Sequence, residues 1–139
     1  MTSATAIAAG VHDGTLSAVD VVEASLRGLD ALEPRLEAWA YVDRNGALAA
    51  ARRIDAGERR QGALLGVPVG VKDIFDVAGL PTACGAGGFT TTLPAVDSAA
   101  VARLRAAGAI ILGKTATTQF AYIDPATTRN PWDPADRKS

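Results

Sequence analysis

The hydrophobic pattern changes its period near residue 63, and this change limits the possible folds more than any other feature. Residues 22–32 carry valines and leucines at helical spacing. From Leu65 to Lys72, valines instead alternate with small or polar residues, which is the two-residue repeat of a β-strand. A predicted helix at 98–107 and an apolar strand at 109–112 follow. This order predicts a βαβ crossover with two parallel strands.

The fold class that follows is α/β, with N-terminal helices leading into a partial mixed or parallel sheet. We expect one domain over residues 1–139, because this length supports a single compact core. Residues 1–62 form a helical lead-in, and residues 63–139 begin the α/β core. Within the lead-in, residues 37–42 are expected to form a short strand and residues 46–56 an alanine-rich helix.

Capping and breaking residues predict where the helices begin and end. Ser17 followed by Asp20 resembles a capping box, and Pro34 is expected to end the helix that starts there. Asp97 is expected to cap the helix at 98–107, with Gly108 as its C-cap.

The balance of charges excludes several classes of protein. Fourteen Lys and Arg residues against fifteen Asp and Glu residues give a net charge of −1, so neither a nucleic-acid arm nor a polybasic membrane patch is expected. The apolar runs are far shorter than the roughly 20 residues that cross a bilayer. The start of the sequence also lacks the pattern of a secretory signal. The expected location is therefore the cytoplasm.

The chain has one cysteine, Cys84, and one histidine, His12. A single thiol cannot form an internal disulfide, and two such side chains are too few for a zinc site. We therefore expect no metal and no cofactor. A thiolate nucleophile would need a positive partner, so Cys84 is expected to be a small apolar filler and His12 a surface residue.

Lys72 is the strongest catalytic candidate in the residue pattern. It ends the predicted strand, and the residues on its side of that strand, Gly66, Pro68 and Gly70, are small. They leave room beside the amine for another chain segment or a substrate. Burial disfavours the charged form of an amine, so a desolvated lysine can act as a base near neutral pH. The alternative is an ordinary lysine that is solvated or paired with Asp73.

Residues 108–115 match the P-loop pattern G-x-x-x-x-G-K-[ST] through Gly108, Gly113, Lys114 and Thr115. A P-loop needs a flexible loop between its glycines, whereas Ala-Ile-Ile-Leu here is the most strand-like segment of the chain. The amides of a buried strand are committed to the sheet and cannot surround a phosphate. Nucleotide binding through Gly108–Thr115 is therefore a remote alternative.

The serines offer no evident nucleophile for Lys72 to activate. None lies in a G-x-S-x-G turn or is flanked by glycines that would free amides for an oxyanion. The full set is Ser3, Ser17, Ser25, Ser98 and Ser139.

Several linked motifs resemble the amidase signature family. Residues 65–73, LGVPVGVKD, resemble its lysine motif, and residues 97–115 resemble its helix-strand pair. Residues 121–122 and 128–132 are similar to the segment before its Gly/Ser-rich catalytic loop, and residues 17–41 are like its helical lead-in. The resemblance spans nearly the whole chain.

This resemblance implies an incomplete amidase-signature fold and a hydrolase that acts on amide C–N bonds through a Ser-Ser-Lys triad. Only Lys72 carries over as a catalytic residue, because the sequence stops at Ser139, where the Gly/Ser-rich loop should begin. We therefore expect a truncated chain that is inactive alone and whose full-length form takes a small-molecule amide. The residues do not indicate which amide is used or whether its nitrogen is transferred.

A second hypothesis is a non-catalytic binding or complementation module. An unclosed parallel sheet exposes strand edges and apolar faces, which favours self-association or pairing with another chain that supplies the rest of the sheet.

Overall fold

The computed structural model describes residues 3–87, 92–133 and 135–136. The elements in this part of the chain are α1 (Ala4–Asp13), α2 (Ala18–Leu36), β1 (Trp39–Val42), α3 (Arg44–Asp55), β2 (Pro68–Lys72), α4 (Ala99–Ala106), β3 (Ile110–Thr115) and a short 3-10 turn, η1 (Gln119–Ala121). No helix among these described residues is both long and apolar enough to span a membrane.

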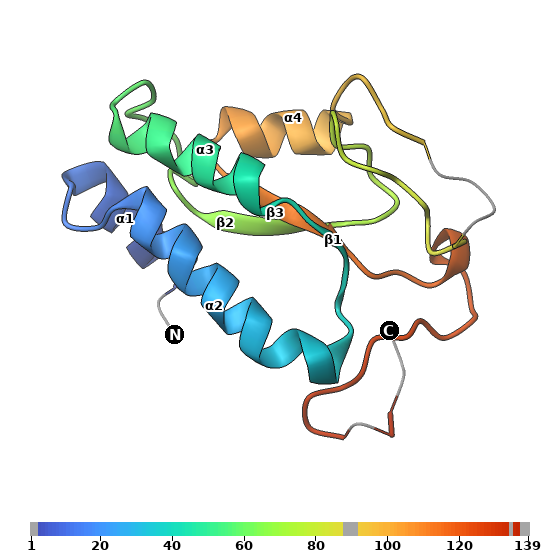
Figure 1. Ribbon diagram of the computed structural model, residues 1–139. Coiled ribbons are helices and arrows are strands. Elements are labelled where there is room, and N and C mark those ends of the chain that lie inside the picture. Colours follow the sequence, from blue (N-terminus) through green and yellow to red (C-terminus); the bar gives the residue numbers. More distant parts are fainter. Residues whose placement is uncertain (1–2, 88–91, 134, 137–139) are drawn as a thin grey trace.

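The three strands form one mixed sheet in the order β1-β3-β2 (Figure 1). β2 and β3 are parallel and are joined through α4, which confirms the βαβ crossover. β1 pairs antiparallel with β3, so the lead-in is not purely helical and supplies one edge of the sheet. The central strand, β3, is buried along almost its whole length.

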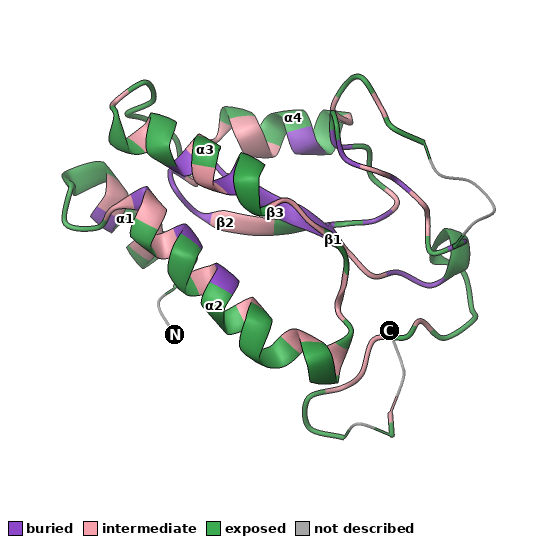
Figure 2. Cartoon of the chain, viewed as in Figure 1, coloured by how far each residue is buried: buried purple, intermediate pink, exposed green. Residues whose placement is uncertain are grey.

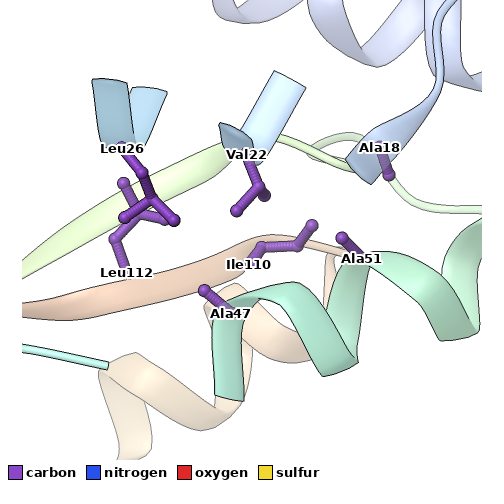
Figure 3. Close-up of a cluster of buried hydrophobic side chains, with 7 residues drawn as sticks. All are labelled: Ala18, Val22, Leu26, Ala47, Ala51, Ile110 and Leu112. Carbon is purple, nitrogen blue, oxygen red and sulfur yellow. The ribbon is translucent and has the colours of Figure 1, made fainter. Parts of the chain in front are cut away.

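Helices cover both faces of the sheet. On one face, α2 and α3 pack against β3, and their buried side chains form one core cluster (Figure 3). Its members are Ala18, Val22, Leu26, Ala47, Ala51, Ile110 and Leu112. On the other face, Val101 of α4 packs with Val71 and Ile111 of the two parallel strands. The alternation of valines in β2 places Val71 in this second core and directs Lys72 to the opposite face.

At the start of α2 the Ser17 hydroxyl caps the helix as predicted, but the Asp20 carboxylate does not, and the end of α2 also differs from the prediction. The Ser17 hydroxyl accepts a hydrogen bond from the Asp20 amide at 3.2 Å. Pro34 was expected to end the helix, yet α2 continues to Leu36 with Pro34 inside its last turn. A proline so near the end of a helix removes one amide donor without stopping the last turn. The carboxylate of Glu33 then accepts hydrogen bonds from the amides of Ala38 and Trp39, at 3.0 and 2.9 Å. Glu33 thus fixes the exit from α2 into β1.

The predicted cap at Asp97 is wrong. Ser98 occupies the N-cap position of α4, without a side-chain capping bond. The carboxylate of Asp97 instead accepts from the Ala78 amide at 2.8 Å and pairs with Arg105 at 2.9 Å. Gly108 follows α4 with φ +92°, and its amide donates to Arg105, as expected for a glycine just after a helix.

The segment after Thr118 is mostly exposed or half-buried (Figure 2). As expected, its residues from Pro125 onward form no regular element wherever the structure describes them. The Thr128 hydroxyl and the Arg129 amide anchor the segment by donating to backbone carbonyls at the end of α2. Three of its large apolar side chains are highly exposed, namely Tyr122, Ile123 and Trp132.

Candidate active site

Lys72 is the last residue of β2, in register with Thr115 of β3. Its side chain is exposed, and it makes no hydrogen bond or ion pair with any residue that the structure describes. The expectation that these residues hold the amine out of water is therefore wrong. The role of Lys72 as a base remains a prediction.

The space beside two of the small residues on the side of Lys72, Gly66 and Gly70, is partly filled by other side chains. A Cβ atom on Gly70 would lie 2.8 Å from the Thr115 methyl group and 2.9 Å from the Trp39 ring. A Cβ atom on Gly66 would lie 2.8 Å from Val11 of α1. These glycines therefore permit close packing of the lead-in against β2.

Asp73 does not pair with its neighbour Lys72. Its carboxylate Oδ1 lies 2.8 Å from the amine of Lys114, and both side chains are buried. Lys114 also donates to the Thr82 hydroxyl at 2.7 Å and to the Pro81 carbonyl at 3.2 Å. The amine of Lys72 is therefore free of the carboxylate that follows it in sequence.

A hollow of about 450 Å³ lies beyond the carboxyl ends of β2 and β3. Ligands of α/β proteins bind preferentially at this edge of the sheet. Asp73, Thr117 and Trp39 are among the residues that line the hollow. A second hollow, of about 310 Å³, lies between α2 and the sheet and is lined by Pro68 and Gly70, on the same face as Lys72. Lys72 thus ends its strand close to two open regions.

A larger hollow, of about 660 Å³, lies among α1, the start of α2 and the loop after α3. His12, Asp55, Arg59 and Arg60 are among its lining residues. His12 is exposed there, as expected. This hollow contains no residue from the carboxyl edge of the sheet, so it is not the candidate active site.

The P-loop pattern forms no phosphate-binding loop. Residues 110–115 are the central strand β3, so their amides belong to the sheet. Lys114 is completely buried against Asp73 and cannot reach a solvent-borne phosphate. This geometry agrees with the interpretation of residues 109–112 as part of a strand.

Cys84 and the serines have structural contacts. Cys84 is half-buried, and its amide and carbonyl bond to Asp73 and Phe120. Ser3 and Ser17 cap helices, and Ser25 bonds within α2. Ser98 is the N-cap of α4, and its buried hydroxyl has no hydrogen-bond partner among the described residues. Ser139 lies outside the described residues.

No group of three or more His, Cys, Asp or Glu side chains could hold a metal ion within the described part of the chain. The buried cluster of Lys114, Asp73 and Thr82 was not predicted from the sequence. A lysine inside an apolar strand was a signal for it, because such a charge requires a buried partner.

The chain is similar to proteins of a known family. The family model for amidases matches residues 20–137. AmiD of Mycobacterium tuberculosis, a protein assigned as an amidase, is 44% identical over 137 residues. That match covers 94% of this chain and 29% of AmiD. One component of the glutamyl-tRNA(Gln) amidotransferase of Acidothermus cellulolyticus is 40% identical, and the match covers 94% of this chain and 28% of that component.

Solved structures give the same result. One of them is described as an unexpected vestigial protein complex that reveals the evolutionary origins of an s-triazine catabolic enzyme. It superimposes on this chain with a TM-score of 0.85 and 34% sequence identity, and the match covers 96% of this chain and 31% of that one. The peptide amidase of Stenotrophomonas maltophilia gives 0.81 and 27%, with the same coverage. The α/β fold is therefore that of amidase signature enzymes. The chain belongs to the amidase family, and it spans about three-tenths of the length of the relatives it matches.

Proposed function

We propose that this chain supplies the catalytic lysine, Lys72, of an amidase that hydrolyses the C–N bond of a small-molecule amide. The observation that carries the proposal is the position of Lys72 inside the family match. It ends a strand at the carboxyl edge of the sheet, and its exposed amine has no partner among the described residues. Such an amine is accessible to a serine hydroxyl from a neighbouring segment.

The proposed reaction follows the Lys-Ser-Ser relay of the family. Neutral Lys72 accepts a proton through a bridging serine, and the nucleophilic serine then attacks the amide carbon. The C–N bond breaks as the leaving nitrogen takes that proton, and water hydrolyses the resulting ester. Residues outside these 139 would supply both serines.

The exposure of Lys72 is consistent with this division of roles. A base near neutral pH needs an amine that is shielded from water, because burial disfavours the ammonium form. The remaining residues of the enzyme would supply that shielding when they pack against the carboxyl edge of the sheet. The isolated chain should therefore release no ammonia from a panel of simple amides.

A chimera tests the proposal. The chain would replace the matching N-terminal portion of AmiD, and ammonia release from primary amides would be followed. Lys72→Ala should lower kcat by at least about a hundredfold while circular dichroism shows an intact fold. Arg53→Ala, at an exposed ion pair with Glu58, is the matched control and should leave kcat unchanged.

Two results would contradict the proposal. Full activity of the Lys72→Ala chimera would remove Lys72 from the mechanism. Turnover by the isolated chain that Lys72→Ala abolishes would show that these residues need no others.

A second candidate function is a complementation module that pairs with another chain. The exposed side chains of Tyr122, Ile123 and Trp132 favour it, together with the outer edge of β2, which pairs with no other described strand. Size-exclusion chromatography at several concentrations tests this function. A monomer that unfolds cooperatively would count against it.

A further inference from the structure

The buried pair of Lys114 and Asp73 has no part in the proposed relay, yet it lies directly beside Lys72. Lys114 is 0% exposed and Asp73 is 2% exposed. Their charged atoms form an ion pair 2.8 Å apart, and the Thr82 hydroxyl accepts a hydrogen bond from Lys114 at 2.7 Å. This cluster stands out because Lys114 carries the largest fully buried side chain among the described residues.

The pair joins three segments of backbone. Lys114 belongs to the central strand and reaches the Pro81 carbonyl at 3.2 Å. Asp73 follows the end of β2, and its own amide donates to the Thr115 carbonyl at 3.0 Å. Its carboxylate accepts from the Ala83 amide at 3.2 Å. Residues 81–84 are thereby held against the carboxyl ends of both parallel strands.

Packing alone does not explain such a pair. Removing two charges from water costs so much free energy that apolar residues of similar volume often stabilise a core equally well. What a buried pair adds is a fixed geometry, because its charged groups tolerate only one arrangement of their hydrogen bonds.

We propose that Lys114 and Asp73 are positioning residues for Lys72. Asp73 is the turn residue directly after Lys72, so fixing its side chain and its amide also fixes the end of β2 from which the Lys72 side chain leaves. An error of about 1 Å in the placement of a catalytic group can cost about a hundredfold in rate. The inference rests on the proposed role of Lys72 and adds the residues that orient it.

The test follows the Lys72 amine in the isolated chain. Reductive methylation with ¹³C-formaldehyde labels accessible amines, and the signal that Lys72→Arg removes is assigned to Lys72. Two altered forms are compared with the unaltered chain. Thr82→Val removes one bond to Lys114, and the double variant Lys114→Met/Asp73→Leu replaces the ion pair with apolar groups of similar size.

We expect the Lys72 signal to shift or broaden in both altered forms. The amides of Ala83 and Cys84 should exchange hydrogen about tenfold faster or more. Val22→Ala is the matched control, because it weakens the core between α2 and the sheet, to which neither Lys114 nor Asp73 belongs. It should lower global stability without changing the Lys72 signal.

An unchanged Lys72 signal in folded Thr82→Val, with unchanged exchange at Ala83 and Cys84, would overturn the inference. If the double variant does not fold, Thr82→Val decides alone. A Lys72 shift of equal size in Val22→Ala would also overturn it, since the effect would then come from stability. These readouts need no activity, so they fail or succeed separately from the Lys72→Ala chimera.

Discussion

Asp55, the last residue of α3, binds Ser17, the residue that caps α2. Its Oδ2 accepts from the Ser17 hydroxyl at 2.7 Å, and the same carboxylate accepts from the first two amides of α2 at 2.8 and 3.1 Å. Free amides at a helix start carry partial positive charge, so a carboxylate there is stabilising. The Asp55 side chain therefore joins α2 and α3, the two helices that pack against β3 on one face of the sheet.

Replacing this carboxylate should weaken the fold. Asp55→Ala leaves two amides of α2 without protein partners, and we expect a loss of about 1 kcal/mol in the free energy of unfolding at pH 7. Urea unfolding measures it. Asp20→Ala is the control, because the Asp20 carboxylate makes no hydrogen bond to the amides at the start of α2. This change should alter the free energy of unfolding by less than about 0.5 kcal/mol.

The same contact predicts a dependence on pH. Burial works to raise the pKa of Asp55, but the hydrogen bonds from Ser17 and the helix amides together outweigh it and hold that pKa below its ordinary value. A carboxyl group with a lowered pKa stabilises the folded state fully above its unfolded pKa of about 3.9. The contribution is lost as pH falls through the folded pKa. The stability difference between the unaltered chain and Asp55→Ala should therefore be constant from pH 7 to 5 and shrink below pH 4.

Gly70 lies against the ring of Trp39, and this contact should not tolerate a methyl group. A Cβ atom would approach Thr115 and Trp39 to within 2.8 and 2.9 Å, so Gly70→Ala should cost about 1–3 kcal/mol in thermal or urea unfolding. Gly28→Ala is the control, because no atom other than the adjacent backbone of α2 itself lies within 4 Å of its added Cβ. That change should stabilise by up to about 1 kcal/mol, since alanine favours a helix. Equal effects at both positions would contradict the packing described.

The helices and strands of this fold could be predicted because strand alternation and helix capping depend on residues that are close together in the sequence. The alternation around Val71 and the capping hydroxyl of Ser17 act within a few positions, and both predictions are confirmed. The Asp55 contact with Ser17 joins residues 38 positions apart, and no local pattern indicates it. The continuation of α2 past Pro34 was not predicted, because it depends on the hydrogen bonds that the Glu33 carboxylate accepts from the Ala38 and Trp39 amides.

The candidate site was predicted less completely than the fold. The residue type and strand position of Lys72 follow from the sequence, but its exposure depends on what covers the carboxyl edge of the sheet. The room expected beside Gly70 is partly filled by Trp39, a residue from the other edge strand. The partner of Asp73 was also missed, because Lys72 is adjacent in sequence whereas Lys114 is adjacent in space.

The two described lysines should differ sharply in reactivity. Lys72 is exposed and Lys114 is completely buried, so acetic anhydride should acetylate Lys72 at least about a hundredfold faster in the folded chain. Peptide mass spectrometry measures both rates. In 8 M urea the two rates should become similar, which controls for differences in their flanking residues. Equal rates without urea would show that the buried pair is open in solution.

Removing one member of the buried pair should lower the free energy of unfolding far more than replacing both members with apolar residues. Lys114→Met leaves the Asp73 carboxylate buried without its cation, and we expect a loss of about 3–5 kcal/mol in the free energy of unfolding. Adding Asp73→Leu removes that buried carboxylate, so the double variant should recover most of the loss. Urea unfolding of the unaltered chain, both single variants and the double variant gives the coupling energy directly. A coupling energy near zero would mean that the two groups do not interact in solution and that the carboxyl end of β2 is held by its backbone bonds alone.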